Sequence, residues 1–398
     1  MSVSTFDASS SLLGYIYQVR YSLYLSLIKI REVNDPDDYY LSIETLDDIA
    51  FDDNGTPTEL LQTKYHSKPG NLTDSSPDIW KTLRIWIESC NNKTIILEQC
   101  DLFLITTESS VDNSVASMLG TTNRDIKNAI KKLTEVAKKS TNKTNKIAYD
   151  LFISLSGDEK ELLFNNIYII NKSETLLETR NKIKSNLRGY ADNSHIDSFT
   201  ERLEGIWFKA IIDSLETKNN KIQLSYLVDE INNLRESFLS DNLPSDYEFS
   251  EYDSNNDDLN FIKQISLFNG SQRIIQQAKL NYYRACEQRI RWSNDSLLKP
   301  GELNMYDRRL INQWEHKIGI IESHPDFITA SEKDMIIYAL DIYNHCHDYK
   351  NGGLPIRKSF IPSYVEHGSY QKLANELTIG WHPNYENLMR SDNKKNVA

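Results

Sequence analysis

Cysteine is scarce in this sequence of 398 residues: there are four, far apart, and no two form a C-x-x-C pair. Such isolated thiols do not suggest a disulfide framework, and a reduced, cytoplasmic compartment fits them best. A long apolar run near the N-terminus is also missing, because Gln18 and Arg20 interrupt it and no basic segment precedes it. We therefore expect neither a signal peptide nor a membrane span.

The sequence also lacks the nucleotide-binding pattern G-x-x-x-x-G-K-[ST], so we expect that the chain does not hydrolyse ATP itself. Nor is there an excess of positive charge, since the net charge is −12. This balance argues against a protein that coats nucleic acid with its whole surface. It does not exclude a nuclease, because the charge that contacts DNA is local.

The segment 124–146 is a local exception to the acidic composition, with eight basic residues against two acidic ones. This excess predicts a track for DNA phosphates. The alternative is an ordinary solvated face of a surface helix. The lysines that we expect to contact DNA are Lys127, Lys131, Lys132, Lys138 and Lys139.

The chain is too long for one ordinary core, so two or three domains are expected. We predict an α+β protein: a mixed α/β domain with a helical extension over residues 1–245, then an all-helical domain over residues 259–398. Between them, the segment 246–258 is acidic and nearly free of aliphatic residues, which predicts a linker or exposed loop.

The stretch from Leu41 to His66 carries the strongest chemical signal. It reads LSIETLDDIAF, then DDNGTP, then TELLQTKYH, which predicts two strands joined by a hairpin turn at Asp-Asn-Gly. Glu44 and Asp48 would share one face of the first strand. Gln62 and Lys64, two residues apart, would share a face of the second. The hairpin is therefore expected to bring these four side chains together.

Two carboxylates, an amide oxygen and a lysine at this spacing suit a hydrolytic metal site. Oxygen ligands from Asp48, Glu44 and Gln62 would bind a hard cation, Mg²⁺ or alternatively Mn²⁺. Such a cation polarises a phosphate and acidifies a water, while the Lys64 ammonium stabilises the developing charge. The alternative, on spacing alone, is a solvated face or a surface ion pair.

Other acidic residues and one histidine nearby remain open as alternatives. Asp47 would replace Asp48 only if a bulge turned its side chain around. Asp37, in the first of three Pro-Asp pairs, is a further substitute, whereas Asp78 and Asp326 in the other two are set aside. His66 would assist a water or contact a phosphate, or else be an ordinary neutral surface histidine.

These residues resemble the PD-(D/E)-x-K nuclease superfamily, in its variant with Q-x-K. The segments GYIYQVRYSLYLSL from Gly14, IETLDDIAF and ELLQTKYH are similar to a nuclease domain shared by several antiphage effectors, as is HIDSFTERLEGIWFKAIIDSL from His195. The resemblance implies a restriction-endonuclease-like fold and metal-dependent cleavage of double-stranded DNA. The order of helix, two strands, helix, strand and basic helix agrees with it.

The C-terminal helices, rich in tyrosine and tryptophan, resemble the C-terminal domain of effectors in three-component Lamassu defence systems, which are built around an SMC-like ATPase. This resemblance implies an antiphage role and two partners, the ATPase and a third small subunit. The partners would hold the nuclease inactive until release and self-assembly into a dimer or tetramer. Two rival interpretations stay open: a non-catalytic DNA-binding scaffold, and a nuclease switched by a cyclic nucleotide.

Overall fold

The structure is a computed structural model that describes residues 8–217, 220–252, 258–348 and 353–389. The chain divides into two compact units between Asn233 and Leu234. The first unit is a mixed α/β fold and the second is helical, so the predicted α+β class is confirmed. No helix among the described residues combines the length and apolar character that crossing a bilayer requires.

The first unit is built on a six-stranded sheet in the order β7-β5-β3-β2-β1-β8. Antiparallel pairs join β8, β1, β2 and β3, whereas β5 runs parallel to β3, and β7 runs parallel to β5. The strands are β1 (Tyr39–Ile43), β2 (Ile49–Asp53), β3 (Thr56–Lys64), β5 (Asp101–Thr106), β7 (Ile167–Ile170) and β8 (Lys221–Gln223). A separate parallel pair consists of β4 (Asn71–Leu72) and β6 (Ser109–Ser110).

The turn of the predicted hairpin is confirmed, but its first strand is wrong. Asn54 and Gly55, with φ of 47° and 92°, form the expected tight turn between β2 and β3. The segment from Leu41 to Phe51, however, is not one strand. It reverses at Glu44, whose φ is 55°, and β1 and β2 pair antiparallel with Ile43 opposite Ile49. An alternating pattern does not distinguish one long strand from two short ones joined by a turn.

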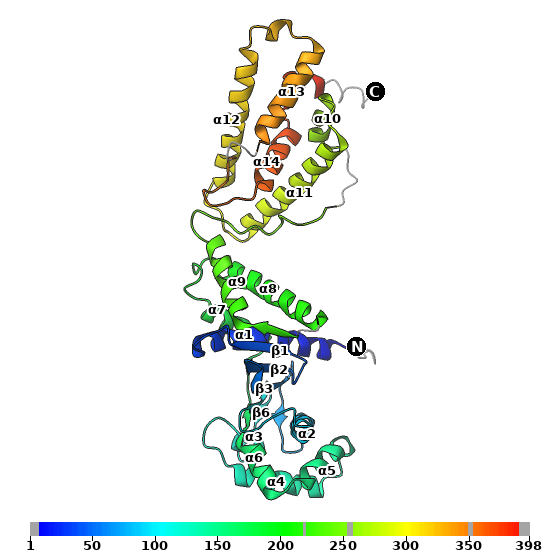
Figure 1. Cartoon of the computed structure of the whole chain (residues 1–398), viewed down its shortest axis with the longest axis vertical. Helices are drawn as coiled ribbons and strands as arrows, with labels where there is room; N and C mark the ends of the chain where they lie inside the picture. Colours follow the sequence, from blue (N-terminus) through cyan, green and yellow to red (C-terminus); the bar gives the residue numbers. More distant parts are fainter. Residues whose placement is uncertain (1–7, 218–219, 253–257, 349–352, 390–398) are drawn as a thin grey trace. The chain divides into compact units, whose positions relative to one another are not determined.

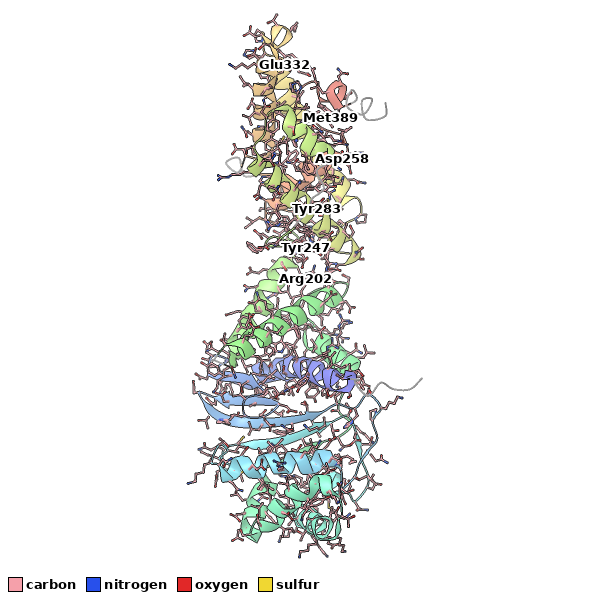
Figure 2. The ribbon with its side chains drawn as sticks, turned by 90° about the vertical axis from the view of Figure 1, so that its right-hand side faces the viewer. Arg202, Tyr247, Asp258, Tyr283, Glu332 and Met389 are labelled. Atoms are coloured by element: carbon pink, nitrogen blue, oxygen red, sulfur yellow. The ribbon has the colours of Figure 1, made fainter. Side chains whose placement is uncertain are left out.

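Helices cover both faces of this sheet (Figure 1). One face carries α1 (Ser9–Glu32), α7 (Leu176–Asn186) and α8 (Ile196–Glu216). The other carries α2 (Pro77–Asn91), α3 (Val115–Met118), α4 (Ile126–Lys139), α5 (Lys146–Ser154) and α6 (Gly157–Asn165). Figure 2 shows the same layering from the side. Because side chains alternate along β3, Leu60 joins the core under α2, and Tyr65 beyond the strand stacks on Tyr17 of α1.

The second unit begins within α9 (Leu224–Ser237) and contains α10 (Asn260–Leu267), α11 (Gln272–Asn294), α12 (Glu302–Glu322), α13 (Glu332–Cys346) and α14 (Tyr364–Asn375). Helix α14 is almost wholly buried and packs along α11. Trp292, Trp381 and Tyr370 are among the large side chains that fill this core. The tryptophan and tyrosine content of the C-terminal half is therefore used for packing.

The acidic segment 246–258 lies only partly within the described residues. Its first part contacts the second unit: Asp246 accepts a hydrogen bond from Gln288 at 2.9 Å, Arg284 donates to the carbonyl of Ser250 at 2.8 Å, and Tyr252 stacks on Tyr283. These contacts place residues 246–252 against α11. The expected domain limits of 1–245 and 259–398 remain a prediction beside the observed division after Asn233.

Candidate active site

Asp48, Gln62 and Lys64 meet at the end of two neighbouring strands. The register that pairs Ala50 with Leu60 sets Asp48 opposite Gln62, on the sheet face under α2. Gln62 Nε2 donates to Asp48 Oδ1 at 3.0 Å, and Lys64 Nζ lies 2.7 Å from Gln62 Oε1 and 3.5 Å from Asp48 Oδ2. The side chains of Asp48 and Lys64 are 20% and 22% exposed, so solvent and ligands can reach them.

Glu44 joins this cluster indirectly. It lies in the turn between β1 and β2, and its Oε1 accepts a hydrogen bond from Gln18 Nε2 at 3.1 Å. The same amide donates to the main-chain carbonyl of Asp48. Gln18 is 4% exposed and comes from α1, so one buried amide ties the turn to the strand that carries Asp48. The contacts of Gln18 are those of a structural support.

Asp47 takes a different place from the one expected. Its side chain is 6% exposed and points inward, where it accepts hydrogen bonds from Gln62 and, at 2.8 Å, from the indole of Trp86 on α2. Burial raises the pKa of Asp47 to about 6, although the hydrogen bonds from Gln62 and Trp86 oppose the rise. The turn that breaks the predicted strand is what reorients Asp47. Asp37 lies on an exposed bend, where its main chain contacts Asp35 and Gln223.

The cluster has the chemistry of a cation site. Asp48 and Gln62 direct oxygens at the same positive group, the Lys64 ammonium. Asp48 is itself held by the main-chain N–H of Thr63, at 2.8 Å. Carboxylate and amide oxygens are the donors that Mg²⁺ and Mn²⁺ accept, so the residues present fit a hard divalent ion.

A second group of metal-binding residues lies beyond the end of β3. His66, Asp78 and Glu108 bring one ligand atom each to within 4.8 Å of one another, and they could hold a metal ion. His66 Nε2 lies 2.7 Å from Asp78 Oδ2. The three residues come from the ends of β3 and β5 and from the first turn of α2.

Sequence reasoning missed this second group. Asp78 belongs to a Pro-Asp pair that was set aside because it follows the Q-x-K motif. Glu108 gave no motif, but it follows a strand that runs parallel to β3, and parallel strands end at the same sheet edge. The pairing of Lys64 with Thr106 aligns these two strand ends. That pairing cannot be read from either segment alone.

The basic segment forms α4, an amphipathic helix with Ala129 and Leu133 buried. Lys127, Lys131, Lys138 and Lys139 are exposed, as a DNA contact requires. Lys132 is half-buried, donates to the carbonyl of Asn113 and lies 3.8 Å from Asp74.

Arg124, which the charge count included, has a structural role. Its guanidinium donates to the carbonyls of Phe164, Asn165 and Ile167 and lies over the ring of Tyr168. The local positive excess available to DNA is therefore smaller than the sequence count.

The C-terminal unit is similar to a known domain family. Residues 261–389, roughly a third of the chain, match the model of CTD7, the C-terminal domain 7 of the ABC-three component (ABC-3C) systems. No curated protein matches the chain. The matched range includes α11 to α14 and nearly all of α10. The helical unit is thus similar to CTD7, a domain of ABC-three component systems.

Proposed function

We propose that the chain is the nuclease effector of its three-component system, a Mg²⁺-dependent endonuclease that cuts double-stranded DNA. The observation that carries this proposal is the convergence of Asp48, Gln62 and Lys64 at the end of two adjacent strands. The order of elements supports a restriction-endonuclease-like core of the Q-x-K type. A helix precedes three antiparallel strands, and a second helix leads to a strand parallel to the third.

Asp48 and the Gln62 carbonyl oxygen would hold the ion, and Glu44 would add negative charge from the adjoining turn. The bound ion would act as a Lewis acid on the phosphate and lower the pKa of an attacking water. Lys64 would then move from its two oxygen partners to a phosphate oxygen. There its ammonium stabilises the negative charge that develops during cleavage.

DNA would approach along the exposed lysines of α4, which supply a local positive excess in a chain whose net charge is −12. A phosphate track of this kind gives sequence-independent binding that weakens with salt. A cut in both strands needs two active sites of opposite orientation. We therefore propose that the active form is a homo-oligomer, a dimer or tetramer.

The partners are proposed from the CTD7 match, since a three-component system implies two other subunits. We propose the Lamassu arrangement, in which an SMC-like ATPase and a third small subunit restrain the nuclease until foreign DNA is sensed. Co-expression with both genomic neighbours should give a complex in which the chain does not cut. Light scattering of the chain alone should show a dimer or tetramer.

The decisive experiment is plasmid cleavage by the purified full chain with Mg²⁺. Replacing Lys64 by alanine should lower the rate by about 10²–10³, because a charge-stabilising donor is lost. Lys221→Ala is the matched control: Lys221 also pairs with an aspartate of the sheet, Asp52 at 2.9 Å, but lies on β8. Cleavage by Lys64→Ala at the wild-type rate would refute the assignment.

One observation favours a second function. A neutral amide at position 62, in place of a carboxylate, neutralises less of the charge on a divalent ion. A DNA-binding scaffold without catalysis would show this feature. Such a scaffold would bind DNA and leave plasmid intact with Mg²⁺ and with Mn²⁺, and Lys64→Ala would change neither result.

A further inference from the structure

Asp47 lies at the centre of a buried hydrogen-bond network behind the proposed ion site. Its Oδ1 accepts from Gln62 Nε2 and, at 3.0 Å, from the main-chain N–H of Asp48. Its Oδ2 accepts from Trp86 Nε1 at 2.8 Å. Three donors therefore converge on the two oxygens of one carboxylate. Asp47 is thereby occupied by the protein and is not available as the ligand that the sequence kept open.

The network leaves Gln62 only one favourable orientation. Its amide nitrogen donates to both Asp47 and Asp48, and its oxygen accepts from Lys64 at 2.7 Å. Rotating the amide by 180° would set the oxygen against two carboxylates and the nitrogen against an ammonium. Acceptors would then face acceptors and donors would face donors. The oxygen thus faces the cation position because the nitrogen side is bound by Asp47 and Asp48.

Trp86 makes this arrangement rigid. The indole is 1% exposed and lies in the core between α2 and the sheet. A tryptophan N–H is only a donor, so the group opposite it must accept. Asp47 meets this requirement and passes the constraint from α2 to Gln62.

We propose that Asp47, anchored by Trp86, is a positioning residue that turns the carbonyl oxygen of Gln62 toward the cation. The inference rests on the proposed metal site at Asp48 and Gln62, and adds the device that orients its weaker ligand. Outer partners of this kind commonly change metal affinity 10–100-fold when they are lost.

Asp47→Asn is the informative substitution because it keeps the size of the side chain. An asparagine has one acceptor oxygen, so its NH₂ group must face either Trp86 or both Gln62 and the N–H of Asp48. Facing Gln62, it would draw the amide oxygen away from the cation, and facing Trp86 it would release the anchor that holds the side chain at position 47. Calorimetric titration of the full chain with Mn²⁺ measures the effect. The relevant binding event is the one that Asp48→Asn abolishes, and we expect its affinity to be about 10-fold weaker in Asp47→Asn.

A second background separates orientation from charge. In Gln62→Glu both terminal atoms are oxygens, so there is no orientation to set. Adding Asp47→Asn there should change Mn²⁺ affinity less than about 2-fold or strengthen it, because a repulsive carboxylate is removed. If Asp47 acted through its charge alone, Asp47→Asn would weaken Mn²⁺ binding equally with Gln62 and with Glu at position 62. That result would overturn the inference.

Asp52→Asn is the matched control. Asp52 is also buried, at 3% exposed, and also lies on β2, but its partners are Lys221 and the N–H of Gly55. It should leave Mn²⁺ affinity unchanged. Equal weakening by Asp52→Asn would show a general loss of stability and reject the role of Asp47. If Asp47→Asn binds Mn²⁺ as tightly as the unsubstituted chain, the role of Asp47 is wrong but the metal site stands. If the unsubstituted chain shows no Mn²⁺ binding that depends on Asp48, the proposed metal site is wrong as well.

Discussion

Gly368 of α14 lies where this helix packs closely against α11. A Cβ atom there would lie 2.0 Å from the carbonyl oxygen of Asn281 and 2.5 Å from Cβ of Ala285, both on α11. Because backbone cannot move aside cheaply, Gly368→Ala should lower the free energy of unfolding by about 1–3 kcal/mol. Denaturant unfolding of the full chain measures this change in the free energy of unfolding.

Gly319→Ala is the control for that substitution. Gly319 lies inside α12, and a Cβ there would meet no atom within 4 Å. Alanine should stabilise this helix by about 0.5–1 kcal/mol, because glycine loses more backbone entropy on folding. A loss of stability at both positions would show that close packing is not what requires glycine at 368.

The residues His66, Asp78 and Glu108 make a prediction about metal stoichiometry. The double substitution Asp78→Asn and Glu108→Gln should remove one bound Mn²⁺ from the full chain, and Asp48→Asn should remove another. Counting bound ions by equilibrium dialysis tests both statements. If cleavage disappears with the first change and survives the second, the catalytic ion belongs to the His66 group.

At the scale of elements, α4 is the one that we expect to bind DNA. If its exposed lysines contact DNA, they would neutralise phosphates and release counterions, so affinity for DNA should fall with salt. Replacing Lys127, Lys131 and Lys138 by glutamine should lower the slope of log K against log salt by up to about 2.7, or 0.9 for each contact. Glutamine at Lys299, Lys333 and Lys358, exposed in the other unit, should leave the slope unchanged.

The whole C-terminal unit should become less stable in mild acid. Burial lowers the pKa of His347 to about 3 and that of His367 to about 4, from an ordinary value of 6.5. Below pH 6.5 both imidazoles are therefore protonated in the unfolded chain but stay neutral in the folded unit. Folding stability is lost as pH falls from about 6.5 toward 4, by at most about 1.4 kcal/mol per pH unit for each imidazole.

Thermal unfolding between pH 7.5 and 4.5 measures this loss in the transition of the helical unit. Asparagine at both His347 and His367 should flatten the dependence on pH. His324→Asn, at a half-exposed imidazole beside Asp326, should leave it as it is. If the unsubstituted chain, the double variant and His324→Asn lose stability equally with falling pH, the buried imidazoles are not the source of the loss.

The sequence by itself determined much of this protein. The expected order of a helix, strands, a second helix, a strand and a basic helix is present in the first unit, and Asp-Asn-Gly identified the turn before β3, because these signals depend on neighbours within a few residues. The side chains of Asp48, Gln62 and Lys64 also come together as strand alternation predicts. Local geometry sets all of these features.

Only the tertiary structure decided the rest. The turn at Glu44 is bonded by Gln18 of α1, and the inward side chain of Asp47 meets Trp86 of α2, so both features depend on how distant helices pack on the sheet. The meeting of His66, Asp78 and Glu108 depends on the parallel pairing of β3 with β5. Residues distant in the chain become neighbours only when a core closes between them, and no spacing within one segment encodes that closure.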